Sequence, residues 1–205
     1  MGFEMSYQAI PPTCGLIELA RSDIEVGESL MSVPYWFTRS VPRPAPGRED
    51  DKKGRLWNWC CRLAGRHPEL FARNCDLDRG WDKLHYLLSA TRRAKPVTPS
   101  DQALDRAFDT GELVAEHVRG GQGVPVRFLS PAAVRDVAEA VRPMSHASLI
   151  AHYHPARMEA AAVYKFRADR ADEAEWMRIV QTFGEFQKFF LVAADVGDAV
   201  IVVRD

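Results

Sequence analysis

His85 is the residue whose type and setting point most directly to chemistry. A histidine side chain can exchange a proton near neutral pH or bind a metal ion. Asp82 lies three residues earlier, a helical spacing at which a carboxylate can contact the ring. Trp81 belongs to the same segment and is a further candidate for ligand contact. Without a third group the Asp82–His85 pair defines no reaction, and a hydrogen-bonded core histidine is the alternative.

A glycine-rich loop is the second candidate feature. Gly120 and Gly121 begin the run Gly-Gly-Gln-Gly, whose backbone N–H groups resemble those that cradle phosphate. The run lacks the following Gly-Lys-Ser/Thr of a phosphate-binding loop and precedes Pro125 and a strand-like segment rather than a helix. A structural turn is therefore favoured, and Gly120 and Gly121 are kept as candidate ligand contacts beside His85.

Metal-ligating and nucleophilic residue types occur without a recognised spacing. They form two loose groups, which are His146, His152 and His154, and Cys60, Cys61, His67 and Cys75. Neither group has zinc-finger spacing, and no Gly-x-Ser-x-Gly nucleophile motif is present. Nothing local predicts a cysteine–histidine pair with His85. The sequence therefore predicts no metal site and no cofactor.

The segment that carries His85 is predicted to be a buried helix. Its inward face has the spacing i, i+3, i+4, i+7, occupied by Trp81, Leu84, His85 and Leu88. We expect Asp78 to act as its N-cap. The helix should fade near Thr91, before Lys95-Pro96, because the residue before a proline avoids helical geometry.

Other segments supply the frame around this helix. Strands are predicted over residues 3–10, 126–129 and 199–203. Helices are predicted over residues 13–22, 55–64, 101–108, 131–141, 145–153, 155–162 and 172–196. Ser100 and Ser130 should cap two of them, and Gly197 should end the longest helix in a left-handed conformation. Strands from both termini and the middle among many helices predict an α+β fold.

Domain organisation follows from length and loop composition. The 205 residues predict a single domain, 1–205, with a proline-rich surface loop at residues 38–54. Trp36 and Phe37 precede this loop and could form an exposed apolar edge.

Composition restricts the classes of partner. The net charge is −1 and no long basic run occurs, so nucleic acid is not an expected partner. No apolar stretch is long enough for a membrane helix, and no signal-peptide pattern opens the sequence. Four cysteines without a CxxC pair indicate reduced thiols and a cytoplasmic protein.

Several segments in order resemble a known family. They are the run Trp81-Asp82-Lys83-Leu84-His85-Tyr86-Leu87-Leu88, the pair Gly120-Gly121, the run from Val126 to Pro131 with its helix, and Gly197-Asp198-Ala199-Val200. In the order of these segments the chain is similar to the YfbM-like family of uncharacterised bacterial proteins. The similarity extends over the whole sequence apart from the proline-rich loop. The resemblance implies an α+β fold and a bacterial cytoplasmic setting. It implies no activity, substrate or catalytic residue.

Two functions are compatible with these residues. The first is a binding or interaction protein with a small molecule or protein as its unidentified partner, favoured by abundant aromatic residues without a complete catalytic signature. The second is an enzyme on a small polar substrate, with a pocket formed by His85 and the Gly120-Gly121 loop. The sequence slightly favours the first and leaves the ligand and the oligomeric state open.

Overall fold

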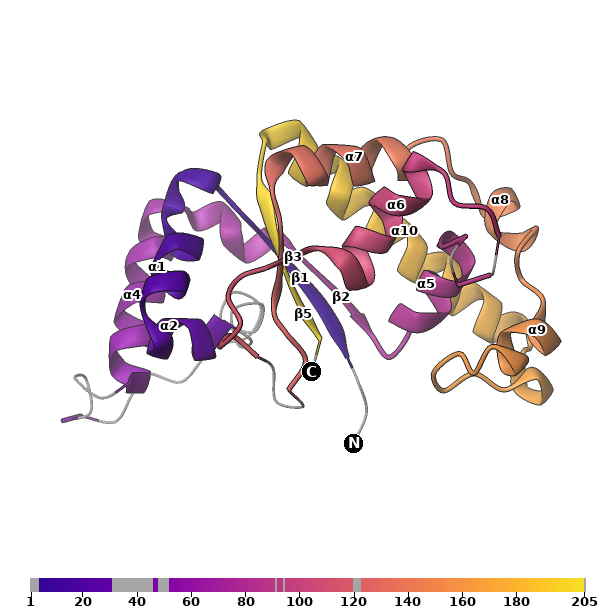
Figure 1. Ribbon diagram of the computed structural model, residues 1–205, viewed down its shortest axis with the longest axis horizontal. Helices are drawn as coiled ribbons and strands as arrows, with labels where there is room; N and C mark the ends of the chain where they lie inside the picture. Colours follow the sequence, from indigo (N-terminus) through magenta and orange to yellow (C-terminus); the bar gives the residue numbers. More distant parts are fainter. Residues whose placement is uncertain are drawn as a thin grey trace.

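A five-stranded antiparallel sheet forms the centre of the molecule in the computed structural model (Figure 1). The structure describes residues 4–30, 46–47, 52–90, 92–93, 95–119 and 123–204. The strand order is β2-β1-β5-β4-β3. The strands are β1 (Met5–Ile10), β2 (Asn74–Asp78), β3 (Glu112–Leu113), β4 (Arg127–Leu129) and β5 (Ala199–Arg204).

The two strands nearest the chain ends pair with each other in the middle of this sheet. Met5 lies opposite Arg204 and Ile10 lies opposite Ala199, so all six residues of β1 are in register with β5. The predicted joining of both termini and the middle in one sheet is confirmed. The apolar run in β5 suits this central position, because both faces of the strand are covered.

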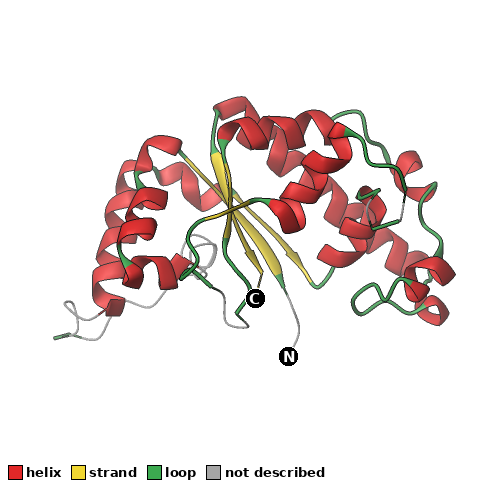
Figure 2. Cartoon of the chain, in the orientation of Figure 1, coloured by secondary structure: helices red, strands yellow, loops and turns green. Residues whose placement is uncertain are grey.

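Alternate residues of β5 point into two different cores. Val200 and Val202 belong to the cluster that contains α5 and α10, whereas Ile201 and Val203 belong to the cluster that contains α1. Since successive side chains of a strand point to opposite faces, one strand supports both layers. The molecule is therefore a sheet with helices on each face, and the predicted α+β class is confirmed (Figure 2).

The smaller helical layer lies at the left of Figure 1. It consists of η1 (Pro12–Cys14), α1 (Leu16–Ser22), α2 (Ile24–Ser29), α4 (Lys52–Arg66) and η3 (Pro68–Ala72). α4 includes the last three residues of the predicted loop at 38–54, and Gly54 within it is buried. Apart from residues 46–47, the remainder of that loop and the Trp36-Phe37 edge lie outside the described residues.

The larger helical layer lies on the opposite side of the sheet. It consists of α5 (Trp81–Leu88), α6 (Pro99–Asp105), the π-helical η4 (Arg106–Thr110), α7 (Pro131–Val141), α8 (His146–Ile150), α9 (Pro155–Ala160), η5 (Ala168–Arg170) and α10 (Glu173–Val196). Both ends of α10 are as predicted. At the start, Asp172 accepts a hydrogen bond from the Glu175 N–H, and Gly197 after the last turn has a left-handed backbone conformation with a φ of 75°.

Two predicted helix starts are wrong. Asp78 ends β2 with a φ of 45°, and α5 begins after Gly80 without a side-chain cap. Thr98 rather than Ser100 caps α6, because Pro99 occupies the first helical turn and leaves the threonine in extended geometry. Ser130 caps α7 as predicted and accepts a hydrogen bond from the Ala133 N–H.

Candidate functional site

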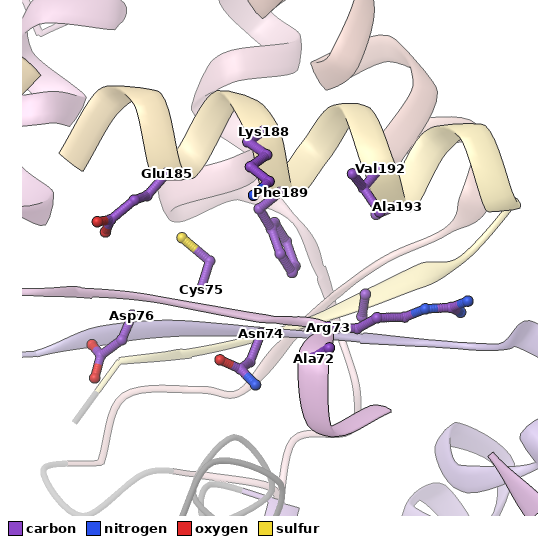
Figure 3. A pocket seen from close by; sticks show the side chains of 11 residues that line it. Ala72, Arg73, Asn74, Cys75, Asp76, Glu185, Lys188, Phe189, Val192 and Ala193 are labelled. Carbon is purple, nitrogen blue, oxygen red and sulfur yellow. The ribbon is translucent and has the colours of Figure 1, made fainter. Parts of the chain in front are cut away.

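A pocket of about 440 Å³ lies between β2 and α10. One face of α10 lines it at the spacing i, i+3, i+4, i+7, with Glu185, Lys188, Phe189 and Val192. Cys75 points from β2 toward this helix, whereas Asn74 and Asp76 point to the other side of the strand (Figure 3). The pocket therefore has an apolar floor and charged groups around it.

Hydrogen bonds hold in place the segment that directly precedes β2 and lines one side of the pocket. The buried Gln8 amide donates from Nε2 to the carbonyl oxygens of Leu70 at 3.2 Å and Arg73 at 2.9 Å. Arg73 Nη1 in turn donates to Asp198 Oδ2 at 2.7 Å. Burial raises the pKa of the Asp198 carboxyl, and Arg73 acts in the opposite direction. The Arg73 guanidinium is thus engaged in holding η3 to the end of α10.

The Cys75 thiol lines this pocket but is not an activated nucleophile. Burial, together with the negative charges of Glu185 and Asp76, raises its pKa to about 12. A thiol with such a pKa stays protonated at neutral pH, and the thiol is a much weaker nucleophile than the thiolate. The pocket therefore offers shape and charge but no activated sulfur.

The outer edge of β2, beside this pocket, carries backbone groups that β1 does not bind. The Ala9 N–H donates to the Arg73 carbonyl at 2.9 Å, and Tyr7 lies opposite Cys75. In an antiparallel ladder, hydrogen-bonded and non-hydrogen-bonded pairs alternate. The N–H and C=O groups of Asn74 and Asp76 consequently point away from β1, and no strand among the described residues pairs with them.

A second hollow of about 330 Å³ continues along the same strand and helix and shares Asp76 and Glu185 with the pocket. Charges on its far side are paired, since Glu175 lies 2.5 Å from Lys83 and 2.6 Å from Arg178. We call the two hollows together the β2–α10 groove.

His85 lies outside this pocket, in the larger core. It is 3% exposed, and its ring stacks on Phe108 with 4.6 Å between centroids. Nε2 lies 3.3 Å from Asp105 Oδ1, and Nδ1 lies 3.6 Å from Asp109 Oδ2. Burial lowers the pKa of His85, while these two carboxylates act in the opposite direction. The ring is therefore held neutral between two acids.

The other sequence candidates take separate positions. Asp82 is buried and accepts hydrogen bonds from Arg92 at 2.8 and 3.0 Å and from the Tyr164 N–H at 2.8 Å. The Arg204 guanidinium lies over the Trp81 ring at 5.2 Å. Asp82 thus anchors α5 to a distant turn.

The remaining part of the predicted pocket is the glycine loop. Gly120 and Gly121 lie outside the described residues. A pocket formed by His85 and this loop therefore stays a prediction.

Metal ligands do not gather in the part of the chain that the structure describes. No group of three or more histidine, cysteine, aspartate or glutamate side chains there could hold an ion. Cys14, Cys61 and Cys75 are free thiols. No helix within those residues has the length and apolar character required to cross a bilayer.

The groove residues were missed by sequence reasoning. β2 reads Asn-Cys-Asp-Leu-Asp, and aspartate and asparagine are depleted in strands. The available signal was the mixed face of α10, where Glu185 and Lys188 share one helical side with Phe189 and Val192.

Comparison with models of protein families gives a match over most of the chain. A family model described as a domain of unknown function (DUF1877) matches residues 52–203. The match begins at the first residue of α4 and ends within β5, and β1 precedes it. No curated protein and no solved structure match the chain.

Proposed function

This chain belongs to the DUF1877 family, whose domain has no known function, and we propose that it is a binding protein whose ligand occupies the β2–α10 groove. The observation that carries this proposal is the pocket of about 440 Å³ between an edge strand and a long helix. Ligand sites commonly have volumes of roughly 300–1,000 Å³, apolar walls and a few placed polar groups. Phe189 and Val192 supply such a wall, and Glu185 and Lys188 supply the charges.

Binding fits this site better than covalent catalysis. The sulfur in the pocket has a pKa of about 12, so it lacks the thiolate that attacks a substrate. Arg73 is engaged by Asp198. These groups support recognition of a ligand without its chemical conversion.

A blocking substitution tests the proposal. Val192 is 46% exposed and lines the pocket, so Val192→Trp should fill the pocket from an exposed position. Val196, one helical turn later and 51% exposed, does not line it and offers Val196→Trp as the control. We expect members of a small-molecule fragment library to shift NMR amide signals of residues 73–76 and 185–193 in the unmodified chain and in the control, but not in Val192→Trp. An absence of such fragments, or equal shifts in both variants, would contradict the proposal.

An enzyme acting on a small polar substrate is the second candidate. The observation in its favour is His85, whose buried Nδ1 has no hydrogen-bond partner among the described residues and faces Asp109. This candidate requires access to the ring past Phe108. Carbethoxylation should then modify His85 as fast as the exposed His154; strong protection of His85 would rule it out.

We also propose that the family assignment extends to the YfbM-like group and to a bacterial cytoplasmic protein. Its support is the order of the shared segments, which form α5, the β4–α7 unit and the turn into β5. Free thiols at Cys14, Cys61 and Cys75 suit a reducing compartment. The near-neutral net charge supports a partner other than nucleic acid. Cell fractionation tests the compartment, and recovery in a membrane or secreted fraction would contradict it.

A further inference from the structure

We propose that the ligand of the β2–α10 groove is an extended peptide segment, which adds to β2 as a further antiparallel strand and directs a basic side chain toward Glu185. This inference rests on the proposed function and specifies its ligand. It follows from three features of the groove, namely a backbone edge that no described strand pairs with, an apolar hollow beside that edge, and acidic groups that have no ion pair with a described residue.

The backbone edge supplies the main-chain recognition. Asn74 and Asp76 direct their N–H and C=O groups away from β1, and no strand within the described part of the chain covers them. An exposed strand edge is a template for a partner strand. Peptides that bind by strand addition gain affinity from these main-chain hydrogen bonds.

The hollow supplies side-chain recognition. Successive residues of an added strand alternate between the two faces, so every second side chain would point toward α10. Such side chains lie about 6.8 Å apart along the strand. The pocket beside β2 has about 440 Å³ of space, with Phe189 and Val192 on its α10 wall. It therefore has room for apolar side chains at alternate positions of the peptide.

Charge selects the peptide further. Asp76, Asp78 and Glu185 line the groove and have no ion pair with a described residue; Glu185 is on the α10 side, whereas the Asp76 side chain points to the other side of β2 (Figure 3). Lys188 is the one basic residue lining the pocket beside β2 that likewise has no ion pair with a described residue. Glu185 and Asp76 are also the charges that act on the buried Cys75 sulfur. A peptide with a basic side chain complements this surface.

The same charges argue against a second copy of this chain as the ligand. Pairing two β2 strands would bring Asp76 and Asp78 of each copy close together. Like charges opposite one another in a sheet destabilise the pairing. Acidic residues and a bulge at the Leu77–Asp78 end also limit uncontrolled edge pairing. The edge thus favours a cationic strand over its own copy.

A palindromic peptide is a suitable probe. Fluorescein-labelled Thr-Val-Thr-Lys-Thr-Val-Thr has one lysine and two valines on one face, and its side-chain order is the same in both directions. In antiparallel pairing, the residues opposite Asn74 and Asp76 have side chains directed away from α10. These are the two threonines that flank the lysine, and their N–H groups should bond to β2.

Backbone methylation separates strand addition from other binding. N-methylation of the two flanking threonines should weaken binding by at least about tenfold in fluorescence anisotropy, because it removes main-chain donors. Methylation of the two valines, whose N–H groups point away from β2, is the matched control and should change affinity little. If both analogues bind like the parent, or both are weakened equally, strand addition is overturned while a ligand site in the groove remains.

Charge reversal on the protein tests the acidic selection. Glu185→Lys should weaken binding of the parent peptide by about tenfold, whereas Asp195→Lys, an equal charge change at an exposed position outside the pocket, should not. Equal effects of the two variants would overturn the role of Glu185. If the parent peptide does not bind but fragments occupy the pocket, the peptide inference is wrong and the proposed binding function still stands. If neither peptide nor fragments bind, the proposed function fails as well.

Discussion

Two carboxylates, one near each ring nitrogen of His85, make this residue electrostatically unusual within the core. Asp105 approaches one ring nitrogen and Asp109 the other, while Arg204 Nη1 binds Asp109 Oδ1 at 2.6 Å. Despite both acids, burial dominates and lowers the pKa of His85. The folded protein therefore resists protonation of this ring.

His85 should make the folded state sensitive to acid. Below its ordinary pKa of 6.5, an unfolded His85 binds a proton that the folded chain excludes, so stability falls as the pH decreases from 6.5 through the lower folded pKa. The loss is at most about 1.4 kcal/mol per pH unit. We expect His85→Gln to lose less free energy of unfolding than the unmodified chain between about pH 7.5 and 5.5, measured by urea denaturation.

The exposed His154 supplies the comparison for this measurement. His154→Gln should retain the acid sensitivity of the unmodified chain, because His85 remains in place. Identical pH profiles for His85→Gln and the unmodified chain would show that other groups dominate the acid response.

Sequence spacing located His85 and Trp81 on a buried helix correctly, and both are buried in α5. It did not identify their partners. Asp82 bonds to the Tyr164 N–H, and the Trp81 ring lies beneath Arg204. These contacts are set by tertiary packing between segments distant in the chain, on which helical periodicity carries no information.

At the scale of elements, strongly patterned segments were predictable and β2 was not. α7 has both the serine–proline start and a regular apolar face, and α10 has an acidic start and a glycine end. β2 has alternating burial, but it is short and carries Asn74, Asp76 and Asp78. Its strand conformation depends on pairing with β1, which lies far away in sequence. Because β2 was missed, so was the groove beside it.

Gly184 within α10 and Gly197 directly after it should respond oppositely to the same substitution. Gly197 ends the helix with a φ of 75°, so Gly197→Ala should reduce the free energy of unfolding by about 1 kcal/mol. Gly184 lies within the helix, where an added Cβ meets no atom within 4 Å. Gly184→Ala should therefore increase stability by about 0.5–1 kcal/mol. Thermal and urea unfolding would measure both, and equal signs would contradict the assigned end of α10.

At the scale of the whole molecule, β5 connects the two helical layers. Ile201 and Val202 are neighbours in this strand, yet they contribute to different cores. Both are at most 3% exposed. The two layers should therefore unfold together, as the predicted single domain requires.

Calorimetry of one core variant tests this coupling. Ile201→Ala should reduce the free energy of unfolding by about 2–5 kcal/mol, because it leaves a cavity beside α1. We expect one shifted transition whose calorimetric and van't Hoff enthalpies agree. A second transition that stays at the original temperature would show that the layer containing α10 unfolds independently.

The position of β5 between β1 and β4 also determines when the sheet can be completed on the ribosome. A nascent chain that has emerged only as far as α10 contains both helical layers, but β1 still lacks a partner on one side and β4 lacks its link to β1. Closing the sheet requires a contact between distant parts of the polypeptide, which slows folding. The exposed flanks of β1 and β4 would meanwhile be substrates for chaperones during synthesis.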